Sequence, residues 1–132
     1  MHATTNTSAL RDYIAGDPAF QRAYERYVPD AAIVARLAAE HPTAHVVVVS
    51  EYWCGDSLRL VPRMARILEL LPGWTVDVLP WKSKAREAPY RVKAIPTFIV
   101  FPDNQQGREE IGRIVERTER ATLEEDLLAL FH

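Results

Sequence analysis

The chain has 132 residues, of which 48% are hydrophobic and 26% charged, and its formal net charge is −2. These values are ordinary for one globular domain that buries a core without metal or disulfide staples. The charge leaves no electrostatic footprint for nucleic acid or an anionic membrane, and the single cysteine excludes an internal disulfide. Residues 1–10 are polar and lack the features of a secretory signal, so the cytoplasm is the expected compartment.

The first third of the chain predicts three helices. A short one spans Ser8–Ala15, before a glycine that ends it. A second begins at Pro18 with Asp17 as its N-cap, because a side-chain oxygen at that position accepts hydrogen bonds from the first turn. Asp30 occupies the same position before a third helix over Ala31–Glu40.

The next segments alternate between strand and helix patterns. Ala44–Val49 is rich in β-branched residues on both faces, which is typical of a central strand covered on both sides. A helix with apolar periodicity follows Ser57, and Pro62 inside it predicts a kink. Trp74–Leu79 alternates apolar and polar residues as a strand does, whereas Lys82–Arg91 is charged and only weakly helical.

The end of the chain predicts a hairpin and a last helix. Ile95–Phe101 is a strong strand signal, and Glu110–Val115 is its expected partner across a loop over 103–107. Thr122 and Glu125 form a capping box for the helix that follows. The order strand, helix, strand, crossover, hairpin and helix indicates an α/β sandwich in one domain.

The stretch Trp53-Cys54-Gly55-Asp56-Ser57 holds the only cysteine of the chain and follows the central strand. Cys54 would then lie at a helix N-terminus, where backbone N–H groups and the helix dipole favour a thiolate. The negative charges of Glu51 and Asp56 oppose this effect. Cys54 is therefore either a reactive thiol or a small apolar packing residue, and its tryptophan and glycine neighbours favour the reactive thiol.

These residues resemble the thioredoxin superfamily. The cysteine stretch stands in the place of that family's Trp-Cys-Gly-Pro-Cys, Pro62 lies where the family kinks its active-site helix, and Ile95-Pro96-Thr97 matches its cis-proline signature; Gly112 before the last helix also fits. The resemblance implies a thioredoxin-like three-layer α/β/α sandwich with a mixed sheet over residues 44–132. Residues 1–43 would be a helical N-terminal extension packed on the same domain. The pattern Glu-x-Trp-Cys-Gly-Asp looks like a little-characterised bacterial branch.

Three departures from the family pattern concern the chemistry. Ser57 replaces the resolving cysteine, so an internal second thiol is missing. Val48 stands where thioredoxins carry a buried acid, and Asp77 where they carry its lysine partner. The resemblance therefore implies that Cys54 can begin a disulfide exchange but needs an external thiol to finish it.

The resemblance also implies roles for the residues around the thiol. Cys54 and Ser57 are the expected catalytic residues; the Ser57 hydroxyl either donates a hydrogen bond to the sulfur or caps the first turn of the helix. A cis bond before Pro96 would bring Ile95 beside the sulfur, where its backbone pairs with an extended substrate. The implied substrate-binding residues are Trp53, Gly55, Asp56, Ile95 and Pro96.

The first functional hypothesis is a one-cysteine thiol-disulfide oxidoreductase that acts on protein or small-molecule thiols and disulfides. It needs no cofactor beyond glutathione or another low-molecular-weight thiol as co-substrate. The alternative is a non-catalytic thioredoxin-fold binding module that uses the groove beside Pro96. A third hypothesis, an iron–sulfur cluster held as in one-cysteine glutaredoxins, is disfavoured by the acid at Asp56. The oligomeric state is left open.

Two further groupings are secondary. His41 and His45 are four residues apart, but Pro42 denies them a regular helical face, so no metal site is expected. There is also a cluster of basic and aromatic residues, for which two interpretations are open. It could bind a glutathione carboxylate or an acidic peptide, but a solvated loop is the simpler interpretation. It consists of Trp81, Lys82, Lys84 and Arg86.

Overall fold

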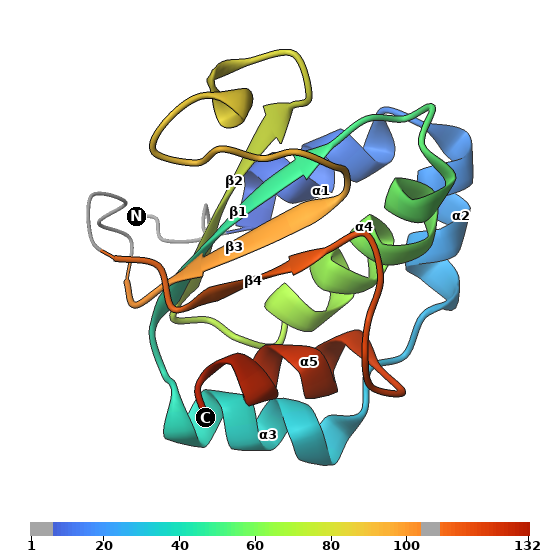
Figure 1. The fold of residues 1–132 in the computed structure, drawn as a ribbon. Helices are drawn as coiled ribbons and strands as arrows, with labels where there is room; N and C mark the ends of the chain where they lie inside the picture. The colour runs from blue at the N-terminus through green and yellow to red at the C-terminus, as the bar shows by residue number, and fades with distance from the viewer. Residues whose placement is uncertain (1–6, 104–108) are drawn as a thin grey trace.

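A computed structural model describes residues 7–103 and 109–132, so most of the loop predicted over 103–107 lies outside the described residues. Four strands form one sheet in the order β2-β1-β3-β4 (Figure 1). In chain order the elements are α1 (Ser8–Ala15), α2 (Pro18–Arg26), α3 (Ala31–Glu40), β1 (Ala44–Ser50), α4 (Gly55–Leu68), β2 (Trp74–Pro80), the 3-10 turn η2 (Lys84–Arg86), β3 (Thr97–Phe101), β4 (Gly112–Val115) and α5 (Leu123–Leu130).

The sheet is mixed, as the thioredoxin resemblance implies. β1 pairs parallel with β2, from Ala44 opposite Trp74, and antiparallel with β3. β4 returns antiparallel along β3, which confirms the predicted hairpin. All seven residues of β1 are buried, so it is the central strand covered on both faces.

The helices cover one face of the sheet, where the larger core lies. Val46 and Val48 of β1 belong to this core, together with residues from each of the five α-helices of the described chain. Figure 1 shows these helices on one side of the strands. Pro62 lies within α4, and the helix runs on past it to Leu68.

The opposite face is covered by a coil segment, residues 81–95, instead of a helix. Val47 and Val49 point to this side and pack with apolar residues of the segment. The weak helix predicted over Lys82–Arg91 is reduced to the single turn η2, because Pro89 denies a helix a backbone donor and restricts the residue before it. The third layer of the thioredoxin-like sandwich is therefore thin.

The N-terminal helices share the main core with the rest of the chain. α1 and α2 pack against each other and against α4, and α3 packs against α5. The fully buried carboxylate of Glu124 accepts hydrogen bonds from Tyr27 Oη and from the Asp30 N–H, each at 2.6 Å. This carboxylate ties the connection between α2 and α3 to the first turn of α5.

The predicted caps are present. Asp17 accepts from the N–H of Phe20, Asp30 from two N–H groups of α3, and Thr122 Oγ1 from the N–H of Glu125. These local signals fix where three of the helices begin.

Candidate functional site

Cys54 is the N-cap of α4 and lies between the end of β1 and that helix. Its backbone is extended, with φ −91° and ψ 121°, and its carbonyl accepts the first helical hydrogen bond from the Leu58 N–H at 3.0 Å. The side chain is half-buried and packs against the core on the coil side of the sheet. The thiol thus lies at the N-terminus of α4, where the N–H groups of the first turn have no acceptor within the helix.

The Ile95–Pro96 segment forms the second half of the site. The peptide bond between these residues is cis, as the resemblance implies. The Cys54 thiol donates a hydrogen bond to the Ile95 carbonyl oxygen, with Sγ and O 3.6 Å apart. Ile95 and Pro96 are both buried, and the Pro96 carbonyl accepts a hydrogen bond from the Glu116 N–H at 2.8 Å. Two segments that the sequence analysis singled out separately are therefore in direct contact.

The rim of the site is open on the side of Trp53 and Gly55. Trp53 is 72% exposed. A Cβ atom built on Gly55 would meet nothing within 4 Å. The rim offers an apolar ring and free space to a molecule that approaches the sulfur.

The Ser57 hydroxyl makes neither of its two expected hydrogen bonds. Ser57 is fully buried, and among the described residues its Oγ has no hydrogen-bond partner. The N-cap of α4 also has no side-chain cap. A buried hydroxyl without a partner carries a desolvation cost of about 1–3 kcal/mol, and here it lies in the first turn that follows the thiol.

The two acids near Cys54 are each turned toward another donor. Glu51 Oε2 accepts the Trp81 N–H at 2.8 Å. Asp56 Oδ1 lies 2.9 Å from a guanidinium nitrogen of Arg59. The negative charge of Asp56 is therefore partly neutralised by Arg59, and the Glu51 carboxylate is held by a backbone hydrogen bond.

The family's buried acid has no equivalent near the sulfur. Val48 is fully buried in the helix-side core. Asp77, opposite Val47 in the middle of β1, lies 3.2 Å from Nε2 of His45, which is near the end of β1 remote from Cys54. Burial lowers the pKa of His45 below its ordinary value, against the opposing effect of the Asp77 charge. The His45–Asp77 pair therefore links β1 to β2 and does not contact the thiol in the way that the family's acid would.

An arginine groove of about 490 Å³ lies between α2 and α4, and the sequence analysis missed it. Its floor is apolar and includes Leu58, one residue after Ser57. Arg63 covers the Tyr27 ring at 5.0 Å. A sequence signal existed, because each helix carries two arginines four residues apart, which share one helical face. The lining arginines are Arg22, Arg26, Arg59 and Arg63.

The cluster around Trp81 lies on the coil segment. Trp81 packs against the same core as Cys54, and the Arg86 guanidinium covers its ring at 4.7 Å. Lys82 and Lys84 are exposed. The aromatic ring is thus near the site, while the two lysines face solvent.

Comparisons with known proteins agree with this fold. The family model described as thioredoxin matches residues 4–126, which include the N-terminal helices. Among solved structures, the chain is similar to PA1234, a protein of unknown function from Pseudomonas aeruginosa, with 22% identity, a TM-score of 0.59 and coverage of 96% of this chain and 72% of that one. An HIV epitope scaffold gives 20% identity, the same TM-score, and coverage of 96% and 74%. No curated protein gives a significant match.

Within residues 7–103 and 109–132, no helix combines the length and the apolar character that crossing a bilayer requires.

Proposed function

Because this chain belongs to the thioredoxin superfamily, we propose that it is a thiol-disulfide oxidoreductase of one-cysteine type, with the active-site pattern Trp-Cys-Gly-Asp-Ser. The observation that carries the proposal is the contact between the Cys54 thiol and the carbonyl before the cis bond of Pro96. A cysteine kept only for packing has no need of a helix N-terminus, an open rim and this neighbour together.

The reaction proceeds in two exchanges. The Cys54 thiolate attacks one sulfur of a disulfide, the S–S bond breaks, and the leaving thiolate takes up a proton; Cys54 is left in a mixed disulfide. An external thiol then attacks this mixed disulfide as its thiolate, regenerates Cys54 and carries away the other half as a new disulfide. A second external thiol then attacks this new disulfide and releases the other half of the substrate as a thiol, so that two electrons pass from two external thiols, which end as a disulfide, to the substrate disulfide. Ser57 cannot form a disulfide, so the second exchange is always intermolecular.

The residues around the sulfur have distinct roles in this proposal. The N–H groups at the start of α4 stabilise the thiolate. The buried Ser57 hydroxyl, to which the described residues offer no partner, donates to the charged sulfur. The Ile95 backbone pairs with the extended segment of a protein substrate. Trp53 and the space beside Gly55 receive its side chains, with Asp56 at the edge of the site.

The resolving thiol in this proposal is glutathione or another anionic low-molecular-weight thiol. The arginine groove supports an anionic partner, because four guanidinium groups gather on one surface of a protein whose net charge is −2. Protein thiols with acidic surroundings fit the same surface. A single cysteine suits a reducing compartment, and we place the protein in the cytoplasm as part of the proposal.

A second candidate function is a binding module without turnover. The observations that favour it are the 72% exposed Trp53 and the absence of an acid at Val48. In that case an extended segment binds beside Pro96, and Cys54→Ala leaves its capture unchanged. Loss of capture in Cys54→Ala would favour the oxidoreductase.

Incubation with glutathione disulfide tests the proposal. We expect one glutathione adduct on Cys54 by mass spectrometry, its removal by added glutathione, and turnover of 2-hydroxyethyl disulfide in the presence of glutathione. Cys54→Ser is the matched control and should gain no adduct. An unmodified Cys54 after prolonged incubation of the folded protein would overturn the proposal.

A further inference from the structure

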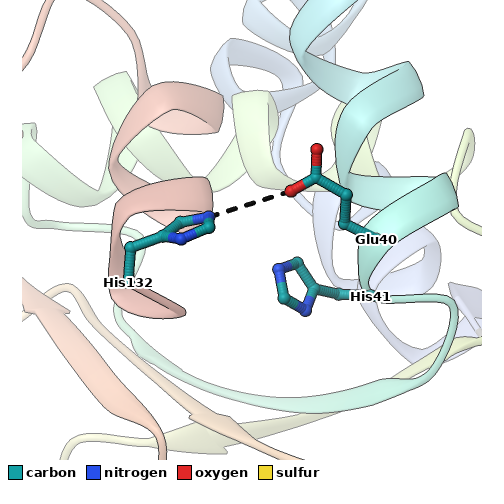
Figure 2. Close-up of side chains that lie close together, drawn as sticks. All are labelled: Glu40, His41 and His132. Atoms are coloured by element: carbon teal, nitrogen blue, oxygen red, sulfur yellow. Dashed lines mark ion pairs between the residues drawn. The ribbon is translucent and has the colours of Figure 1, made fainter.

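A second cluster of reactive side chains lies far from Cys54 in the chain, where the end of α3 meets the residues after α5. Glu40, His41 and His132 each present a possible ligand atom, and these three atoms lie within 4.8 Å of one another. Figure 2 shows the His41 ring pointing into the space between the other two side chains. The sequence analysis weighed His41 with His45; the structure pairs it with a histidine from the opposite end of the chain.

The His41 ring is held in place from several sides. It stacks on Phe131 with ring centroids 3.8 Å apart and an interplanar angle of 16°. Its backbone N–H donates to the Leu37 carbonyl at 2.8 Å, and its carbonyl accepts from Trp74 Nε1 at 2.7 Å. A ligand fixed in this way loses little conformational freedom when it binds an ion.

The His41 Nε2 atom is buried and has no hydrogen-bond partner among the described residues. Buried polar atoms are nearly always hydrogen-bonded, so an isolated one points to a missing partner. Histidine imidazole is the commonest metal ligand in proteins, and this nitrogen is the one without a partner.

We propose that Glu40, His41 and His132 bind one Zn²⁺ ion, with water as the fourth ligand. Two imidazoles and a carboxylate are ligands that zinc accepts in tetrahedral sites. Bonds of about 2.0–2.2 Å place such ligand atoms roughly 3.3–3.6 Å apart. Glu40 Oε1 and His132 Nε2 are already 3.8 Å apart, and the exposed His132 side chain can close the remaining gap.

Arg36 orients the carboxylate of this site. Its Nε donates to Glu40 Oε2 at 2.9 Å, while Oε1 faces His132. The second contact, from Arg36 Nη2 to Oε1 at 3.4 Å, is long and gives way when the ion binds. Hydrogen bonds of this kind to the outer oxygen of a ligand commonly position it for the metal.

The bound ion would link the end of α3 to the residues that follow α5. Zinc that binds the folded chain and not the unfolded chain raises stability by mass action. The site takes no part in the thiol chemistry proposed above, since Glu40 and His132 are not among the residues around Cys54.

Titration of tag-free protein with zinc chloride, followed by calorimetry in a Cys54→Ser background, tests the proposal. The background removes the thiol as a competing ligand. We expect one ion per chain and a higher midpoint of thermal unfolding with zinc. His132→Gln should weaken binding by more than about tenfold, the effect that loss of even an outer-shell partner can have. Cobalt chloride should give the visible absorption of a tetrahedral site.

Three further variants separate the site from a general effect of charge. His41→Phe keeps an aromatic ring against Phe131 and should lose binding while the fold is retained. Glu40→Gln should weaken binding, whereas Arg36→Gln, which breaks the same ion pair, and Glu25→Gln on α2 should not abolish it. No zinc binding by the folded protein, or undiminished binding in both histidine variants, would overturn the proposal.

Discussion

The thiol of Cys54 and the carbonyl oxygen of Ile95 are 3.6 Å apart, although 41 residues separate them in the chain. Cys54 is positioned by the junction of β1 and α4, and Ile95 by the entry to β3, the antiparallel neighbour of β1. Adjacent central strands thus bring both halves of the candidate site to one end of the sheet. The following predictions test what this arrangement does.

Replacing Ser57 by cysteine should supply the missing second thiol. The new side chain would lie in the first turn of α4, three residues after Cys54, so we expect an internal disulfide to form. A glutathione adduct on Cys54 should then be released without added thiol, as mass spectrometry over time would show. Ser8→Cys adds a thiol on α1 and serves as the control. Persistence of the adduct in Ser57→Cys would contradict the geometry assigned to this turn.

Replacing Ser57 by alanine separates a chemical role from a packing role. A hydrogen bond to a charged group is worth about 1.5–3 kcal/mol, which is roughly a ten- to hundredfold change in the thiolate fraction. A more basic thiolate is also a better nucleophile, so alkylation of Cys54 by iodoacetamide at neutral pH should slow by about tenfold. The free energy of unfolding should stay the same or rise, because the buried Oγ has no partner in the described structure. Unchanged alkylation together with lower stability would indicate that the hydroxyl only fills space.

The arginine groove should distinguish anionic from neutral disulfides. In the double variant Arg22→Gln/Arg26→Gln we expect a several-fold loss of rate with glutathione disulfide at low salt and little change with 2-hydroxyethyl disulfide. The effect should shrink as salt is added, because exposed charges are screened over about 10 Å at 0.1 M. Arg11→Gln, an exposed arginine of α1 outside the lining, is the matched control. Equal losses with both disulfides would argue against recognition of charge.

Removing the buried carboxylate of Glu124 should destabilise the fold. Glu124→Leu leaves Tyr27 Oη and the Asp30 N–H without their acceptor, and we expect the free energy of unfolding in urea to fall by about 2–4 kcal/mol. Glu124→Gln keeps an acceptor oxygen and should cost less. The neighbouring Glu125→Gln is the control. If Glu124→Leu unfolds at the same urea concentration as the unmodified protein, α2, α3 and α5 are held together by apolar contacts alone.

The buried His45 predicts that stability falls in mild acid. Its pKa is lowered in the folded state, chiefly by burial, so below about pH 6.5 the unfolded chain takes up a proton that the folded chain refuses. Stability contributed in this way is present at neutral pH and decreases as the pH falls, by at most about 1.4 kcal/mol per pH unit. Urea unfolding at several pH values would measure it, and His45→Gln should flatten the slope. An unchanged slope would assign the acid sensitivity to other groups.

Sequence patterns predicted the features that depend on residues close together in the chain, such as helix caps and the burial of a strand. Asp17, Asp30 and Thr122 cap the helices they were expected to cap, and the run of valines in β1 is buried on both faces. The thioredoxin resemblance added what local patterns lack, namely that the segment around Pro96 meets Cys54.

The remaining features depend on contacts between distant segments. Nothing near Ser57 in the sequence shows that its hydroxyl is buried without a partner, because that depends on the packing of α4 on the sheet. The meeting of His41 with His132 requires α3 and α5 to lie side by side. The weak helix predicted over Lys82–Arg91 is limited to η2, because the charged residues of this segment suit a helix while Pro89 prevents one.

Because of the coil over residues 81–95, the two sides of the candidate site, Cys54 and Ile95, are not equally well packed. Cys54 is attached to a helix whose apolar face lies in the larger core, whereas Ile95 ends a segment held by a few apolar side chains, among them Tyr90 and Val92. Sparse contacts of this kind permit local opening at a lower free energy than global unfolding. We expect the backbone amides of residues 84–93 to exchange with deuterium well before those of α4. The Ile95 side of the candidate site can then change its shape while the sulfur stays in place.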